Sequence, residues 1–187
     1  TWSSDISSVY WMGFELEFVD IRLETLAIDE KLLRRKIEND KNIKAVFLTH
    51  AQGINGLTED IYNCCKENEV ILIEDVCESH GVKVDKNSKA GSKGDLSCFS
   101  FYYAHHMSTI EGGMICTNSE ETYQHLRMLR GHGMLRETTN NQLKNNYERE
   151  YPDLNPQFIF TGPGFNVRNN EIGAIIGLSQ IKRLDTM

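Results

Sequence analysis

The sequence predicts an α/β domain built around a largely parallel sheet. Short apolar runs that suit strands alternate with amphipathic stretches that suit helices, which is the pattern of a layered α/β fold. One run, Ala45–Thr49, shows almost no polar alternation, as expected for a strand buried on both faces of a parallel sheet. Polar residues follow two later apolar runs, at the place where open α/β sheets bind their ligands.

The predicted strands are short apolar runs that end at polar or turn-forming residues. They are Leu16–Ile21, Ala45–Thr49, Val70–Ile73, Leu96–Phe101 and Met114–Thr117. The Val70–Ile73 run is wholly apolar and stops at Glu74 and Asp75. Because parallel neighbours are joined through helices, we expect right-handed crossovers.

The predicted helices have an apolar side or a capping residue. They are Asp29–Glu38, Thr58 to about Asn68, Ser119 to Gly131 or Gly133, and Glu171–Leu184, the last rich in small residues that would permit close packing. In the first, Leu32, Leu33 and Ile37 are predicted to lie on one side and charges on the other. Thr58 and Ser119 each offer an N-cap oxygen. The polar stretch from Glu137 to Pro156 predicts a long loop or an excursion outside the core.

The composition indicates one globular domain and argues against several classes of protein. The chain has 187 residues, of which 40% are hydrophobic and 25% charged, as in a folded domain with its own core. Its net charge of −7 argues against a nucleic-acid partner, which would require a basic face, and against an anionic membrane surface. No apolar run approaches the roughly 18 residues that a membrane span needs.

The five cysteines form neither a metal-binding nor a disulfide pattern. We therefore expect reduced thiols in a cytoplasmic protein, and no metal site. The N-terminus has neither the basic nor the apolar region of a signal peptide. A start at Thr1 in place of methionine suggests that the sequence is a piece of a longer chain.

Two strand ends carry the candidate functional groups. Asp75 follows one strand, where a desolvated carboxylate can hold a cationic ring nitrogen; a helix N-cap is the alternative role. Ser100 ends the next strand, and its hydroxyl, with the flexible Gly112–Gly113 pair nearby, suits a phosphate. His105 follows and can act as an acid or base because imidazole titrates near neutrality; a packing or surface role is the alternative.

Several separated motifs occur in a fixed order along the chain. They are Glu74-Asp75…Glu78…His80-Gly81, Gly91-Ser92-Lys93-Gly94-Asp95, Ser100-Phe101…His105, Glu111-Gly112-Gly113, Arg130-Gly131-His132-Gly133, Gly164-Phe165-Asn166-Val167-Arg168 and Gln180-Ile181. Together they resemble the DegT/DnrJ/EryC1/StrS family of sugar-nucleotide aminotransferases over essentially the whole sequence. The resemblance implies the three-layer, mostly parallel large domain of a fold-type I pyridoxal-phosphate-dependent transferase. Residues 1–187 would form part of this domain, whose N-terminal part and C-terminal small-domain partner are absent from the sequence.

One position departs from the aminotransferase pattern. The fifth residue after the strand-end serine is, in those enzymes, the lysine that forms a Schiff base with the cofactor; here it is His105. An imidazole cannot form that bond, so the cofactor would be held without a covalent link. The change is similar to that in the family's 3-dehydratase subgroup, and Glu78, where aminotransferases usually have Gln, points the same way. A second histidine subgroup carries an iron–sulfur cluster on cysteines beyond the equivalent of Gly133, where this chain has none.

The resemblance implies a pyridoxamine/pyridoxal phosphate-dependent 3-dehydratase acting on a nucleotide-linked 4-keto-6-deoxyhexose in O-antigen or lipopolysaccharide biosynthesis. His105 would move the proton between the cofactor and the departing C3 hydroxyl, and Asp75 would keep the ring nitrogen protonated. Ser100 would bind the phosphate, Glu78 and His80 would lie near the ring, and glutamate would regenerate the amine form of the cofactor. Asn166 resembles the residue that reaches the neighbouring subunit's phosphate, which implies a homodimer with shared active sites; a turn residue is the alternative.

Two other functions stay open. A sugar-nucleotide aminotransferase with an altered acid–base group would keep the cofactor and change the product. A catalytically silent fragment of such an enzyme would have the same fold but no activity.

Overall fold

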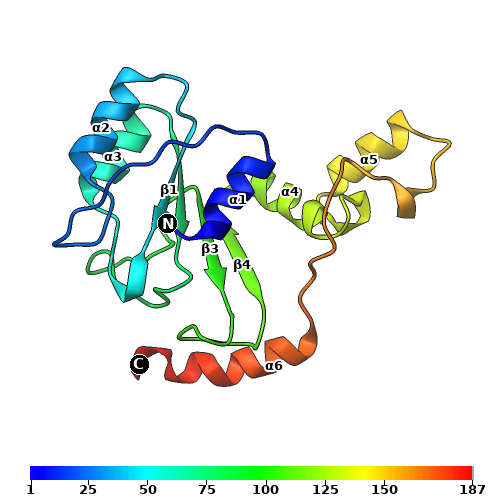
Figure 1. Cartoon of the computed structure of the whole chain (residues 1–187). Coiled ribbons are helices and arrows are strands. Elements are labelled where there is room, and N and C mark those ends of the chain that lie inside the picture. Colours follow the sequence, from blue (N-terminus) through cyan, green and yellow to red (C-terminus); the bar gives the residue numbers. More distant parts are fainter. Residues whose placement is uncertain (187) are drawn as a thin grey trace. The chain divides into compact units, whose positions relative to one another are not determined.

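The computed structural model describes residues 1–186, which divide into two compact units. The first unit holds residues 1–116 and the chain from Glu171 onward, and the second holds Thr117–Asn170. The elements in order are α1 (Ser3–Trp11), α2 (Glu30–Asn39), β1 (Ala45–Thr49), α3 (Glu59–Glu67), β2 (Ile71–Asp75), β3 (Leu96–Ser100), β4 (Gly113–Thr117), α4 (Glu120–Arg130), α5 (Asn141–Glu150) and α6 (Glu171–Gln180), with 3-10 turns at Ala51–Gly53, Leu135–Glu137, Pro156–Phe158 and Ile181–Thr186 (Figure 1).

The strands form a sheet in the order β1-β2-β3-β4. β1 pairs with β2, and β2 with β3, in parallel, so the predicted largely parallel sheet is confirmed. The register places Thr49 beside Asp75 and Asp75 beside Cys98. The carboxyl ends of three strands therefore meet at one edge of the sheet, which is the edge where ligands bind in open α/β folds.

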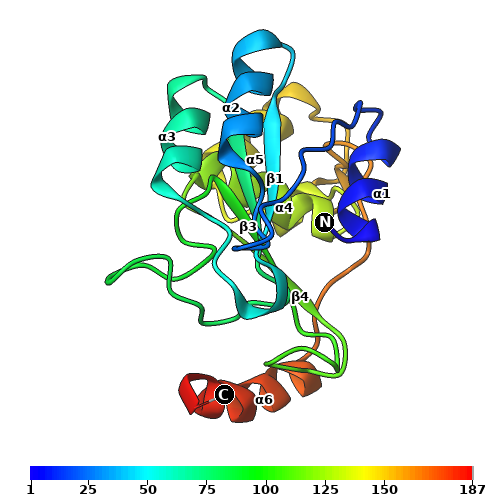
Figure 2. The same ribbon diagram turned by 60° about the vertical axis from the view of Figure 1, so that its left-hand side comes forward.

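One face of the sheet is covered by α2 and α3, which lie side by side in Figure 2. Asp29 caps α2 by accepting the N–H groups of Lys31 and Leu32, as its short polar side chain favours. Apolar residues of the two helices pack against the strands to form the main core; they include Leu33, Ile37, Ile61, Val46, Leu48 and Leu72. The predicted caps at Thr58 and Ser119 are confirmed, because each hydroxyl accepts the N–H three residues ahead.

The prediction that both faces of Ala45–Thr49 are buried is wrong. Val46 and Leu48 are buried, but Ala45 is exposed and Phe47 and Thr49 are half-buried. Successive side chains of a strand point to opposite faces. β1 is an edge strand, and only its α2/α3 face is fully covered, so the uniformly apolar sequence does not become uniformly buried.

The predicted strand at Leu16–Ile21 is also wrong. Within this range the only strand-like pairing is a single antiparallel bridge from Ile21 to Ile28. The chain reverses between them through Leu26, which has a φ of 54°. Since no neighbouring strand pairs with the rest of the run, Phe18 stays 63% exposed in spite of its strand propensity.

The polar stretch from Glu137 to Pro156 is an excursion, as predicted, but it contains a helix. Asn140 caps α5 by accepting the N–H of Leu143, and no residue of α5 is buried. Leu143 and Tyr147 are half-buried against a small core in the second unit, formed by Met128, Leu135 and Ile159. Among residues 1–186, no helix has both the length and the apolar character that crossing a bilayer requires.

α6 runs beside the loop that joins β3 to β4, as both ribbon views show. At Gly177, an added Cβ would lie 3.3 Å from Cγ2 of Thr109, so the small residue allows the helix to approach the loop closely. This contact confirms the close packing predicted from the small residues of the Glu171–Leu184 segment. It places a helix directly against the loop that carries His105.

Candidate active site

Asp75 is a buried carboxylate at the end of β2. It is 5% exposed, and its Oδ1 accepts the N–H of Cys77 at 3.0 Å. No helix begins between Asp75 and the start of β3 at Leu96, so Asp75 is not a helix N-cap. Among the described residues no lysine, arginine or histidine forms an ion pair with it. A buried anion without a cationic partner is an acceptor that suits a protonated ring nitrogen.

Ser100 is the last residue of β3, one residue short of the predicted strand end. The register sets Asp75 beside Cys98, and side chains two residues apart share a face, so Ser100 and Asp75 lie on the same face of the sheet. The Ser100 Oγ accepts the N–H of Tyr102 at 3.3 Å, which leaves the hydroxyl proton to donate. A hydroxyl donor on the same face as a buried carboxylate suits a ligand that carries both a ring nitrogen and a phosphate group.

His105 lies in the loop that follows β3. Its backbone N–H donates to the carbonyl of Tyr102 at 3.1 Å, which turns the chain back over the strand end. The imidazole is half-buried and stands edge-on to Tyr102, with ring centroids 5.7 Å apart, and to His80, with centroids 6.3 Å apart. The structure therefore places His105 in the loop that directly follows Ser100, at the carboxyl edge of the sheet.

Glu78 and Asn166 have defined partners of their own. Glu78 is exposed, and its Oε2 accepts the N–H of Gln52 at 3.1 Å, so it ties the loop after β2 to the loop after β1. Asn166 belongs to the second unit, whereas the other four candidates belong to the first. Its Oδ1 accepts Nη1 of Arg168 at 2.7 Å, and Arg168 also donates to Glu137 at 2.8 Å. Because Arg168 occupies the oxygen, the amide N–H2 of Asn166 is the group offered to a ligand.

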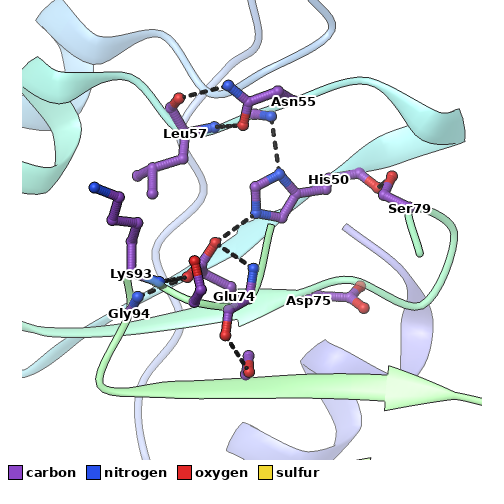
Figure 3. A network of polar contacts seen from close by, with 12 residues as sticks. His50, Asn55, Leu57, Glu74, Asp75, Ser79, Lys93 and Gly94 are labelled. Atoms are coloured by element: carbon purple, nitrogen blue, oxygen red, sulfur yellow. Dashed lines mark hydrogen bonds and ion pairs between the residues drawn. The ribbon is translucent and has the colours of Figure 1, made fainter. Parts of the chain in front are cut away.

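A buried network around Glu74 was missed by the sequence analysis. Glu74 and His50 are both fully buried, and His50 Nε2 lies 2.9 Å from Glu74 Oε2. The Glu74 carboxylate also accepts the backbone N–H groups of Gly91, Lys93 and Gly94, at 2.9, 3.0 and 2.6 Å. Figure 3 shows these contacts converging on Glu74, while Asp75 points away from them.

The same network fixes the protonation of His50. Its Nδ1 accepts the N–H of Gly56 at 3.0 Å, so Nδ1 carries no proton and Nε2 carries the proton that is donated to Glu74. Burial alone would raise the pKa of Glu74, but the donors from His50 and the Gly91–Gly94 loop outweigh burial and lower it. The sequence contains a signal for His50, because it directly follows the strand Ala45–Thr49. Asp75 and Ser100, which were identified as candidates, likewise stand at the ends of strands.

Ile110, in the loop after His105, has an unfavourable backbone conformation. Its φ of 75° lies in the left-handed region, which a β-branched residue rarely adopts. Its side chain is 64% exposed, so burial of the side chain does not offset this backbone strain. We expect Ile110→Gly to raise the free energy of unfolding by about 0.5–1 kcal/mol, because the relief of left-handed strain exceeds the added entropy of an unfolded glycine. Urea unfolding of the chain measures this change.

The matched control is Ile115→Gly, on β4, where Ile115 is 50% exposed and lies in a strand. We expect this variant to be less stable, since glycine weakens a strand interior. Equal destabilisation by both substitutions would contradict the assignment of strain to Ile110.

Comparison with known proteins places this geometry in a family. The sequence model of the DegT/DnrJ/EryC1/StrS aminotransferase family matches residues 1–187. GDP-4-keto-6-deoxy-D-mannose 3-dehydratase of Escherichia coli O55:H7 is 34% identical over 98% of the chain, and that of Yersinia pseudotuberculosis is 32% identical. A UDP-4-amino-4,6-dideoxy-N-acetyl-beta-L-altrosamine transaminase of Campylobacter jejuni is 27% identical. The chain spans 46% of the length of the E. coli relative.

Solved structures give the same result. The E. coli GDP-4-keto-6-deoxy-D-mannose-3-dehydratase with bound hydrated PLP superimposes with a TM-score of 0.82 and 32% identity, over 99% of this chain and 46% of that one. A structure of GDP-4-keto-6-deoxymannose-3-dehydratase with bound GDP-perosamine gives a TM-score of 0.83 and 31% identity, over 99% of this chain and 47% of that one. The fold predicted from the sequence is therefore confirmed.

Proposed function

Because the chain belongs to the DegT/DnrJ/EryC1/StrS aminotransferase family, we propose that it supplies part of the active site of a pyridoxamine/pyridoxal phosphate-dependent 3-dehydratase. The substrate is a nucleotide-linked 4-keto-6-deoxyhexose. The observation that carries this proposal is His105, five residues after the strand-end Ser100, where an aminotransferase of the family has its Schiff-base lysine. The identity of 34% and 32% to two GDP-4-keto-6-deoxy-D-mannose 3-dehydratases is consistent with the same conclusion.

The residues present fit the cofactor. Asp75 is a buried acceptor without a cationic partner, as the pyridine N–H requires, and Ser100 offers a hydroxyl donor on the same face for the phosphate. Glu78 borders the ring from the loop after β2. Asn166, whose side-chain oxygen accepts from Arg168, would donate its N–H2 to the phosphate of a neighbouring subunit. Residues 1–187 thus form part of the large domain of a homodimer with shared active sites.

His105 moves the proton in this site. The chemistry that bound pyridoxamine phosphate supplies is an amine for the C4 ketone and a ring that accepts electrons. An imidazole nitrogen of His105 takes up a proton as base and returns it to the departing C3 hydroxyl oxygen as acid, two roles that one imidazole side chain can perform in turn. Because His105 has no primary amine, it cannot capture the aldehyde form of the cofactor, and ordinary transamination is disfavoured.

The remaining parts of the proposal concern partners and setting. Glutamate serves as amino donor and leaves as 2-oxoglutarate, which restores the amine form of the cofactor. The product is a 3-deoxy sugar nucleotide for O-antigen or lipopolysaccharide biosynthesis. A cytoplasmic location agrees with the five cysteines, all of which are free thiols, as is usual in a reducing compartment.

The test is an assay of the full-length protein with GDP-4-keto-6-deoxymannose, pyridoxal phosphate and glutamate. We expect one ammonia and one 2-oxoglutarate for each 3-deoxy sugar formed. A stable amino sugar would identify an aminotransferase and overturn the proposal. Titration of residues 1–187 with pyridoxamine phosphate, followed by absorbance, shows separately whether this chain alone binds the cofactor.

A further inference from the structure

His80 is a buried imidazole on the side of β3 that faces away from Ser100. It is 7% exposed and is stacked on the rings of Phe99 and Phe101, with centroids 5.9 and 5.8 Å away and interplanar angles of 12° and 15°. Phe99 and Phe101 are two residues apart and therefore share a face, opposite to that of Ser100. His80 thus packs behind the strand end whose front carries the candidate cofactor groups.

Neither ring nitrogen of His80 has a well-formed hydrogen bond among the described residues, and the nearby backbone carbonyl of Ser100 can satisfy only the nitrogen that carries the proton. A neutral imidazole carries one donor and one acceptor, and each buried polar group left unpaired costs about 1–3 kcal/mol. A phenylalanine would stack between Phe99 and Phe101 without that cost. The unprotonated nitrogen of His80 therefore requires a hydrogen-bond donor that the packing alone does not supply.

Two imidazoles stand edge-on to His80 and can supply that partner. The ring centroids of His105 and His106 both lie 6.3 Å away, at interplanar angles of 77° and 88°. Of the two, His105 is half-buried and His106 is exposed, so a hydrogen bond to His105 is better shielded from water. Burial, reinforced by the nearby positive charges of protonated His105 and His106, lowers the pKa of His80 to about 4. His80 is therefore neutral at physiological pH and keeps an acceptor nitrogen.

We propose that His80 is a positioning residue for His105: one water accepts the N–H of His105 and donates to the unprotonated nitrogen of His80, which leaves the opposite nitrogen of His105 as the free base. Hydrogen bonding at one imidazole nitrogen decides which nitrogen carries the proton. The meaning of this bond for catalysis rests on the function proposed above, but the bond itself does not depend on it.

Histidine tautomers test the inference in the chain without cofactor. Long-range ¹H–¹⁵N spectra of ¹⁵N-histidine-labelled protein, recorded from pH 5 to 8.5, resolve the six histidines, and the His105 signals are assigned by their loss in His105→Asn. We expect one tautomer of His105 in the unmodified chain and a mixture of both in His80→Phe. The matched control is His106→Asn, in which His105 keeps its single tautomer.

Three results would overturn the inference. They are a tautomer mixture for His105 in the unmodified chain, an unchanged single tautomer in His80→Phe, and loss of the single tautomer in His106→Asn but not in His80→Phe. His80→Gln keeps an acceptor oxygen, so it should preserve the single tautomer. If His80→Phe does not fold, the tautomer of His105 in His80→Gln is the result that tests the inference.

The full-length enzyme provides a second readout. His80→Phe should lower kcat about 10- to 100-fold with little change in KM, because a misoriented base slows the proton transfer and leaves substrate binding intact. His80→Gln should restore most of the rate. If the unmodified enzyme shows no dehydration, the proposed function fails, while the tautomer spectra still decide the role of His80.

Discussion

Replacing His105 with asparagine should lower the rate of C3 deoxygenation by about 10²–10⁴-fold, the contribution that a positioned acid–base group usually makes. Asparagine keeps a polar side chain at the carboxyl edge of the sheet but cannot take up a proton. The measurement is the formation of 3-deoxy sugar nucleotide and 2-oxoglutarate by the full-length protein. Cofactor binding should persist, because Asp75 and Ser100 are unchanged.

The neighbouring histidine is the control for this prediction. His106 is exposed and adjacent in the same loop, so His106→Asn should keep the rate within a few-fold. An equal loss in both variants would place the effect in the loop as a whole and contradict the role given to His105.

His105→Lys should convert the site to covalent cofactor binding. A lysine amine at this position can form a Schiff base with pyridoxal phosphate, which gives a new absorption band in the visible region. The product should then shift from a 3-deoxy sugar toward an amino sugar. If the cofactor binds without producing the band, the side chain at position 105 does not face it.

Replacing Glu74 with glutamine should lower the free energy of unfolding by about 3–5 kcal/mol, the usual result of breaking a buried charged network. Each carboxylate oxygen accepts two donors, Oε2 from His50 and Gly91, and Oε1 from the Lys93 and Gly94 N–H groups. The N–H2 group of glutamine cannot accept, so two buried donors lose their partner whichever way the amide turns. Urea unfolding of the chain measures the loss.

The control is Glu24→Gln, since the Glu24 side chain is 75% exposed and its ion pair with Arg22 is 3.9 Å long. It should change the unfolding free energy by less than about 0.5 kcal/mol. A similarly small effect for Glu74→Gln would show that the buried network contributes little.

The stability that Glu74 contributes should also depend on pH. Its folded-state pKa is lowered below the ordinary value of 4.5, so the unfolded chain binds this proton more readily than the folded chain does. The contribution is therefore complete above about pH 4.5 and is lost as the pH falls through the folded pKa. We expect the unfolding free energy of the unmodified chain to decline on acidification more steeply than that of Glu74→Gln.

Much of the fold was predictable because local patterns and tertiary packing agree. The Ala45–Thr49 run coincides with β1, and caps at Thr58 and Ser119 mark where α3 and α4 begin. The failure at Leu16–Ile21 is one of pairing. A strand needs a hydrogen-bonded neighbour, and the sequence of one segment does not say whether another lies beside it.

The site was predictable in its groups but not in their orientation. Glu74 and Asp75 are adjacent acids, and sequence assigned the ligand role to Asp75 without a role for Glu74. Their opposite directions follow from the alternation of side chains in β2, and only the register shows which face carries Ser100. The contact of His50, the residue after β1, with Glu74 on β2 depends on the strand register, and the surroundings of His80 depend on packing. Sequence could therefore indicate these residues but not their contacts.

The hydrogen between His50 and Glu74 gives the protein a built-in spectroscopic marker of folding. A proton held on an imidazole nitrogen against a carboxylate, with both side chains sealed from solvent, should resonate far downfield in a ¹H spectrum and exchange slowly with deuterium oxide. Its disappearance during a denaturant or temperature series would report when water first enters between the first two strands, even where circular dichroism still records intact helices.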